Sequence, residues 1–300
     1  MIIEAINNSF LVYNPEDNRT IHGFYMHCVN LIKKSLIKNN LNLNVILGNY
    51  SPEFSNTNKI VKIGIQYEHT LVKLGGRSVQ EIIFGDIKHE DGVYLIRIDN
   101  FEYYNNLDSI IEYSLANIHN ISTNKKFDDY LKRVTYISSA YYNINFEKEL
   151  KTDIITMFVD SSNFRRNNVL SDLANLNVPI TKIQNCYDSD GLNEIYKKSK
   201  ILINVHQTEH HHTLEELRIL PALMTGVLII SEKVPLTDII PYSDYIIWSN
   251  YENIAQTTFE VMNNYEYYYN KIFIEGKLTL ILSNLIKNDE NAFDKILINL

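Results

Sequence analysis

Short β-branched runs and amphipathic segments alternate through the second half of this 300-residue chain, and this alternation limits the fold more than any other feature. Repeated strand–helix–strand units form parallel sheets with right-handed connections. The second half therefore predicts an α/β fold. The expected strands are 153–159, 180–186, 200–206, 227–230 and 245–248, and the expected helices are 161–174, 190–199, 252–268 and one that begins at Thr213.

The first half alternates less regularly and is also interpreted as α/β. Its long helix should begin at His22-Gly23 and end near residue 40, and a second helix is expected over Tyr104–Ala116. Strand-like sequence in the first half gives way to the charged segment FEKELKTD. We therefore place a boundary there and expect two domains, 1–145 and 146–300. The tail from 277 to 300 predicts an amphipathic helix with a polar break at 288–291. Expected strands are 2–5, 10–13, 43–47, 60–66, 81–84, 93–98 and 135–139.

Composition excludes several classes of protein. Hydrophobic residues make up 45% and charged residues 21%, as in ordinary soluble proteins. A net charge of -8 argues against non-specific binding to nucleic acid. Cys28 and Cys186 are too few for a disulfide framework. No apolar run approaches the ~20 residues of a membrane span. The start MIIEA lacks the features of a signal peptide, so we expect a cytoplasmic location.

Polar side chains gather directly after the expected strand 200–206. Side chains at the carboxyl end of a parallel strand, before a helix, lie where open α/β sheets bind ligands. Thr213 and Glu216 have the T-x-x-E spacing of a capping box. Consecutive histidines on one loop rarely converge on a metal, so we expect no metal site. The gathered side chains are His206, His210, His211, His212, Glu215, Glu216 and Arg218.

Two arginines, Arg165 and Arg166, follow the expected strand 153–159 and open a helix. Positive charge at a helix N-terminus opposes the helix dipole, and a guanidinium fork suits a diphosphate, so this pair favours a binding role. The triplet Asp188-Ser189-Asp190 has the D-x-D pattern of divalent-metal sites, but it precedes a helix, and Asp190 is expected to be its N-cap. Dinucleotide, P-loop and nucleophile-elbow motifs are absent from the sequence.

Four segments in order resemble the nucleotide-sugar half of GT-B glycosyltransferases: IITMFVDSSNFRRNNVL, DSDGLNEIYKKSKILINV, LPALMTGVLIISE and PYSDYIIW. The resemblance covers residues 150–260 and includes a divergent group with viral and microbial members. It implies a GT-B-like α/β fold, with two Rossmann-like domains whose parallel sheets face a cleft. The second domain would hold a nucleotide-sugar donor.

The resemblance also implies roles for the candidate residues in a metal-independent, hexosyltransferase-like enzyme without a cofactor. The acceptor would be a glycan, lipid or protein, and would approach His22 and Gly23. Catalysis would use His206 or His212 with Glu216. Donor contacts would come from Arg165, Arg166, Glu215, Glu216 and Arg218.

One departure from the family pattern leaves other functions open. Many retaining members have two glutamates eight positions apart, whereas here Thr213 and Pro221 stand at those places. Pro221 also lacks an amide hydrogen and should kink the helix near Leu217. The alternatives are a non-catalytic GT-B-like binding protein and a nucleotide-sugar epimerase on the same fold. A zinc-dependent hydrolase that uses the histidine loop is a weaker alternative.

Overall fold

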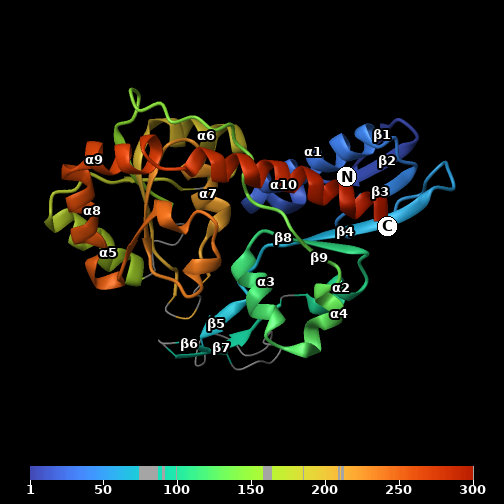
Figure 1. Cartoon of the computed structure of the whole chain (residues 1–300), viewed down its shortest axis with the longest axis horizontal. Helices are drawn as coiled ribbons and strands as arrows, with labels where there is room; N and C mark the ends of the chain where they lie inside the picture. The colour runs from blue at the N-terminus through green and yellow to red at the C-terminus, as the bar shows by residue number, and fades with distance from the viewer. Residues whose placement is uncertain are drawn as a thin grey trace. The chain divides into compact units, whose positions relative to one another are not determined.

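A computed structural model describes residues 1–73, 87–89, 92–98, 100–157, 164–184, 186–208, 210 and 213–299. The chain divides into two compact units (Figure 1). The first unit contains described residues of 1–71, 78–141 and 285–300, and the second contains those of 72–77 and 142–284. The end of the chain thus belongs to the first unit, whereas the expected division assigned it to the second domain.

A five-stranded, fully parallel sheet forms the centre of the second unit, in the order β11-β10-β12-β13-β14. Along the chain, β10 is followed by β11, which lies on one side of it, and then by β12, which lies on its other side. The strand order therefore reverses between β10 and β12, which makes that edge a topological switch point. The strands are β10 (Asp153–Thr156), β11 (Thr181–Lys182), β12 (Ser199–Asn204), β13 (Leu228–Glu232) and β14 (Ile246–Ser249).

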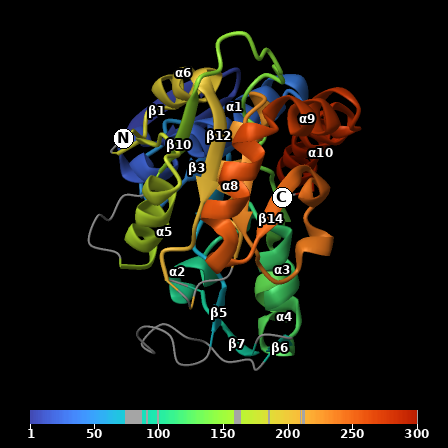
Figure 2. The same cartoon turned by 90° about the vertical axis from the view of Figure 1, so that its left-hand side faces the viewer.

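Helices cover both faces of this sheet. α5 packs against α8 on one face, and α6 and α7 lie on the other (Figures 1 and 2). Strand β13 is buried along its whole length, which explains why its sequence is continuously apolar until its last two residues. The helices are α5 (Phe164–Asn175), α6 (Ser189–Lys198), α7 (Glu216–Met224), α8 (Ile254–Asn263) and α9 (Tyr265–Tyr269), followed by a π-helical turn at Asn270–Ile274.

The first unit contains a six-stranded sheet in the order β1-β2-β3-β4-β8-β9, parallel except for β1. Its described strands follow chain order, so they contain no reversal of the kind found in the second sheet. The α/β class expected from the sequence is confirmed in both units. The strands are β1 (Ile2–Ile6), β2 (Ser9–Tyr13), β3 (Leu43–Leu47), β4 (Lys59–Gln66), β8 (Ser109–Glu112) and β9 (Val134–Tyr136).

The remaining elements are a small sheet, several helices and short turns. The small sheet has the order β5 (Leu71–Lys73), β7 (Gly92–Ile96) and β6 (Ile87–His89). The expected strand 81–84 lies outside the described residues. The helices are α1 (His22–Lys38), α2 (Phe101–Asn105), α3 (Leu115–Ser122), α4 (Asp128–Leu131) and α10 (Leu278–Asn299). The 3-10 turns are Pro15–Ile21, Lys125–Phe127, Thr237–Ile239, Ser243–Tyr245 and Tyr251–Asn253.

Two expectations about helices are wrong. The segment Tyr104–Ala116 is not one helix, because its centre forms the buried strand β8. Short apolar runs such as this one cannot be assigned from periodicity alone. Helix α10 continues through 288–291 without a break. Asp289 is 1% exposed and accepts hydrogen bonds from the amide (2.9 Å) and hydroxyl (2.6 Å) of Ser138, so this polar residue is a buried anchor.

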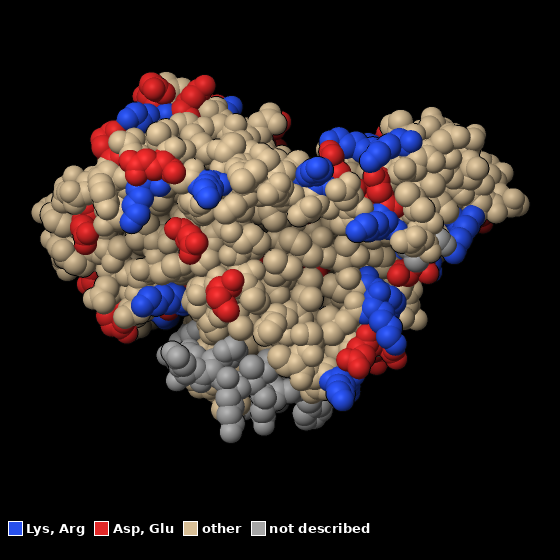
Figure 3. All heavy atoms as spheres, viewed as in Figure 1, with Lys and Arg blue, Asp and Glu red and all other residues tan. Residues whose placement is uncertain are grey.

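The surface shows no concentration of one charge on the face drawn in Figure 3, where acidic and basic side chains are interspersed. In the described part of the chain, no helix is long and apolar enough to cross a membrane.

Candidate functional site

The switch point of the second sheet brings together most of the side chains singled out in the sequence. Helix α5 begins near the carboxyl end of β10, and Val205 and His206 follow β12 directly. The next strand, β13, ends at Glu232. His211 and His212 lie outside the described residues.

Arg165 is held in one orientation by several contacts. Its guanidinium makes a two-bond ion pair with Glu232, with Nη1 2.6 Å from Oε2 and Nη2 bonded to Oε1. Nη1 also lies 3.3 Å from the carbonyl oxygen of His206. The ring of Tyr251 lies under the guanidinium, 3.9 Å from Cζ, and its hydroxyl donates to the carbonyl of Arg165 at 2.8 Å. The Arg165 side chain is still 19% exposed.

Glu232 is the carboxylate that binds Arg165, and it is 5% exposed. Burial raises the pKa of its carboxyl, but hydrogen bonds from Arg165 and the nearby His206 outweigh burial and lower it below the ordinary value. The backbone amide of His206 donates to it at 3.1 Å. Glu232 is not among the residues that the sequence predicted for this edge. Its signal was a carboxylate that ends an otherwise apolar strand beside the expected switch point.

Arg166 is buried and does not resemble a ligand contact. Its Nε and Nη2 donate to the carbonyl of Val205 at 3.0 and 2.9 Å, and Nη2 lies 3.4 Å from Glu215. Glu215 also forms an ion pair with Arg218. Arg218 in turn lies 3.4 Å from Oδ1 of Asn204, at the end of β12. These contacts tie the starts of α5 and α7 to the end of β12.

Glu216 is not part of a capping box, so that expectation is wrong. Helix α7 begins at Glu216 itself, and its N-cap residue, Glu215, makes no side-chain capping bond within the described residues. The amide of Glu216 instead bonds to the carbonyl of Leu214 at 2.8 Å, in a turn before the helix. The Glu216 side chain is 1% exposed and accepts a 2.6 Å hydrogen bond from the hydroxyl of Tyr242. A cap therefore does not account for this glutamate.

The other candidates occupy different places. His206 is buried at the end of β12, and the amide of His210 bonds to the hydroxyl of Thr208 at 3.2 Å. Within the described ranges, no group of three His, Cys, Asp or Glu residues is placed to hold a metal ion. Asp188, not Asp190, caps α6 by accepting from the amide of Gly191 at 2.7 Å. Helix α7 is continuous through Pro221.

His22 and Gly23 are the first residues of α1, in the first unit. A Cβ at Gly23 would lie 2.8 Å from the ring of Tyr141. A larger residue at this position would therefore force the ring of Tyr141 to move.

Comparisons with known proteins give a distant relative and weak structural similarities. No protein-family model matches the chain. An uncharacterized protein of Acanthamoeba polyphaga mimivirus, R358, is 27% identical over 235 residues, which cover 69% of this chain and 77% of that protein. The structure of TarM has a TM-score of 0.44 and 11% identity, and the match covers 84% of this chain and 54% of TarM.

The structure of the GtfA/B complex bound to UDP and GlcNAc has a TM-score of 0.34 and 12% identity, with 91% of this chain and 60% of that chain covered. The chain thus spans little more than half of either solved chain. The function proposed below rests on the geometry of the switch point and not on these similarities.

Proposed function

We propose that the chain is a glycosyltransferase that binds a nucleotide sugar at the β10/β12 switch point of the second unit. The observation that supports this most is Arg165. Its partly exposed guanidinium lies at the ligand-binding edge of a parallel sheet and is already oriented by Glu232 and Tyr251. A planar fork of N–H donors binds a diphosphate through two parallel hydrogen bonds, for which the diphosphate would compete with Glu232.

Sugar transfer breaks the bond between the anomeric carbon and a diphosphate oxygen, and the departing nucleoside diphosphate gains negative charge. A fixed cation beside that oxygen stabilises the transition state more than the ground state. Arg165 would supply this charge without a metal ion or other cofactor. Arg166 is only 4% exposed, so in this proposal it positions α5 and does not contact the donor.

The remaining roles follow from how each side chain is held. Glu215 pairs with two arginines and Glu216 with Tyr242, so both would orient the donor side of the site through those partners. His206 remains the proposed proton-transfer or orienting histidine among the described residues. His22 and Gly23 remain proposed acceptor-side residues, for a glycan, lipid or protein acceptor.

A non-catalytic binding protein is the second candidate. Pro221 fills a buried position in α7 where a glutamate is found in many retaining relatives of the resembled family. All three arginines of the switch point also pair with carboxylates. Slow hydrolysis of a nucleotide sugar by the purified chain, undiminished by EDTA, would favour the enzyme over the binding protein.

Thermal unfolding with uridine, guanosine and adenosine diphosphates and their sugars tests the proposal. A ligand at about a hundredfold excess over its dissociation constant stabilises the folded state by about 2.7 kcal/mol, which is readily measured. Arg165→Lys keeps the charge beside Glu232 but removes the fork, so it should abolish most of the shift.

Arg19→Lys is the matched control, because Arg19 forms an exposed ion pair with Glu16 in the first unit. The control should respond to nucleotides as the unmodified chain does. If no nucleotide raises the melting temperature, or if Arg165→Lys leaves the shift intact, the proposal is wrong.

A further inference from the structure

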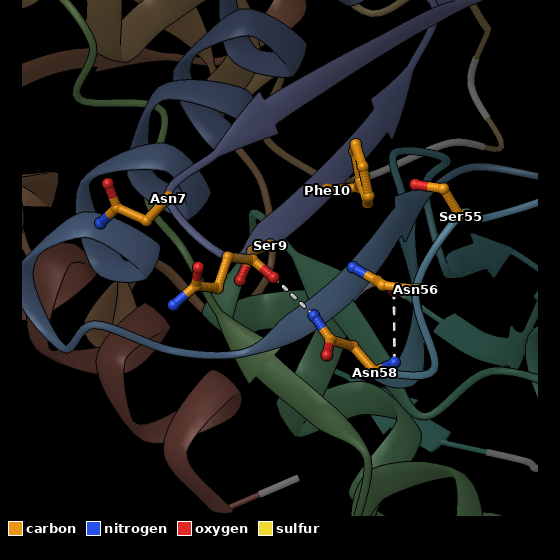
Figure 4. Close-up of a pocket in the computed structure, with 7 residues that line it drawn as sticks. Asn7, Ser9, Phe10, Ser55, Asn56 and Asn58 are labelled. Carbon is orange, nitrogen blue, oxygen red and sulfur yellow. Dashed lines mark hydrogen bonds between the residues drawn. The ribbon is translucent and has the colours of Figure 1, made fainter.

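We propose that a polar pocket in the first unit is a separate binding site for a neutral carbohydrate. The pocket has a volume of about 370 Å³, within the range of roughly 300–1,000 Å³ typical of small-molecule sites. It is lined by four asparagines, two serines and Phe10 (Figure 4).

The pocket lies at the edge of the six-stranded sheet where β2 and β4 begin. Asn7 and Asn8 form the turn between β1 and β2, and Ser55, Asn56 and Asn58 belong to the segment that precedes β4. This is the opposite edge from the one that carries ligands in parallel α/β sheets. All the lining residues belong to the first unit and the switch point to the second, so the inference does not rest on the proposed glycosyltransferase activity.

Hydrogen bonds fix the orientation of two of the amides. Oδ1 of Asn56 accepts from Nδ2 of the buried Asn44 at 2.7 Å and from the backbone amide of Asn58 at 3.2 Å. Nδ2 of Asn58 donates to the carbonyl of Asn8 at 2.5 Å. These bonds identify which end of each amide is nitrogen. Within the described residues, the NH₂ of Asn56 and the Oδ1 of Asn58 have no protein partner, so they offer a ligand one fixed donor and one fixed acceptor.

The lining selects the class of ligand. None of the lining side chains is charged, so the pocket offers no charge to balance a phosphate, a carboxylate or a metal cation. Sugar hydroxyls both donate and accept, and so do carboxamides and serine hydroxyls. Phe10 adds an aromatic ring, whose centroid is 6.0 Å from that of Phe54 and tilted by 32°. A ring beside several amides and the exposed hydroxyl of Ser55 fits a pyranose, which has an apolar C–H face and a polar rim.

The test uses the full chain and a panel of neutral saccharides: cellobiose, maltose, lactose and N,N′-diacetylchitobiose. Binding is followed by isothermal titration calorimetry and by saturation-transfer NMR. Because the pocket is open and forms few hydrogen bonds, we expect a dissociation constant on the order of 1 mM for the preferred sugar.

Asn56→Asp is the informative variant. The carboxylate retains an oxygen for the bonds from Asn44 and Asn58 but replaces the ligand-facing NH₂ donor, so binding should weaken at least about tenfold. Asn253→Asp is the control, since it adds the same charge at an exposed position of the second unit. Ser55→Ala removes one exposed lining hydroxyl and decides the question if Asn56→Asp does not fold.

Loss of sugar binding in Asn56→Asp or weakening in Ser55→Ala, with normal binding in Asn253→Asp, would support the site. Failure of every saccharide to bind at about fifty times the expected dissociation constant would overturn it. So would sugar binding that both pocket variants leave unchanged. Nucleotide-induced stabilisation should be the same in all three variants, which separates this result from the test of the glycosyltransferase proposal.

Discussion

Replacing Glu232 by glutamine should destabilise the second unit while improving its affinity for a nucleoside diphosphate. Glutamine keeps the shape and one carbonyl oxygen, which can still accept from Arg165 or from the amide of His206. It removes the negative charge that neutralises the Arg165 guanidinium. A phosphate then binds Arg165 without displacing a competing carboxylate.

The expected loss of stability follows from the burial of the pair. Removing one partner of a fully buried ion pair costs about 3–5 kcal/mol. Arg165 is 19% exposed, so water solvates part of the unpaired guanidinium, and one hydrogen bond survives. We therefore expect the free energy of unfolding to fall by about 2 kcal/mol. Arg165→Met should cost more, because it leaves the carboxylate of Glu232, only 5% exposed, without its cation. The double variant should show a coupling of about 1.5–3 kcal/mol.

Trp248 makes this measurement specific to the second unit. It is the single tryptophan of the chain and lies on β14, paired in register with Ser231 of β13 next to Glu232. Urea unfolding followed by tryptophan fluorescence therefore reports the part of the structure that the substitution changes.

Acid should remove the difference between the two proteins. The folded-state pKa of Glu232 lies below the ordinary 4.5, so its stabilisation is present above pH 4.5 and is lost as the pH falls through the folded-state value. A zero coupling energy, or a stability difference that does not shrink in acid, would refute the ion pair. An unchanged or weaker affinity for nucleoside diphosphates would refute the competition between Glu232 and phosphate.

Three other predictions concern buried polar groups. Tyr242→Phe removes the 2.6 Å bond to Glu216 and should cost about 2 kcal/mol in the same fluorescence assay, and an unchanged stability would contradict that bond. Burial lowers the pKa of Lys151 to about 8, so ¹³C NMR of its Cε should show a titration near pH 8. Between pH 8 and 10.5 the unfolded state binds more protons than the folded state, so the free energy of unfolding should rise with pH over that range. Titration near 10.5 would argue against a buried ammonium. Asp289→Ala leaves the amide and hydroxyl of Ser138 without their acceptor, so the free energy of unfolding should fall by about 3 kcal/mol. Backbone hydrogen exchange in the first unit should become faster, and unchanged exchange would count against the anchor.

Much of the second sheet could be predicted because its strands are short, apolar and separated by helices with clear polar faces. Strand β8 could not, because Ser109–Glu112 has only a few apolar residues and is buried on all sides. The continuity of α10 depends on a partner far away in sequence, since Asp289 accepts hydrogen bonds from Ser138. No local pattern contains that information.

The sequence predicted which residues share this edge of the second sheet but not the contacts between them. The edge of the sheet follows from strand order, and so Arg165 and the segment after β12 could be expected there. The partner of Arg165 could not be expected, because Glu232 is 67 residues away in sequence. The pairing of β13 with β12 brings Glu232 to this edge. The start of α7 was misplaced because the T-x-x-E spacing fits a cap that the turn at Leu214 replaces.

The course of α10 affects which residues each unit needs. Residues 142–284 of the second unit are contiguous, so a truncation after residue 284 leaves this run intact. The first unit draws on residues beyond 284 as well, because Lys38 pairs with Asp294 and Ser138 with Asp289. A truncation after residue 284 should therefore destabilise the first unit more than the second.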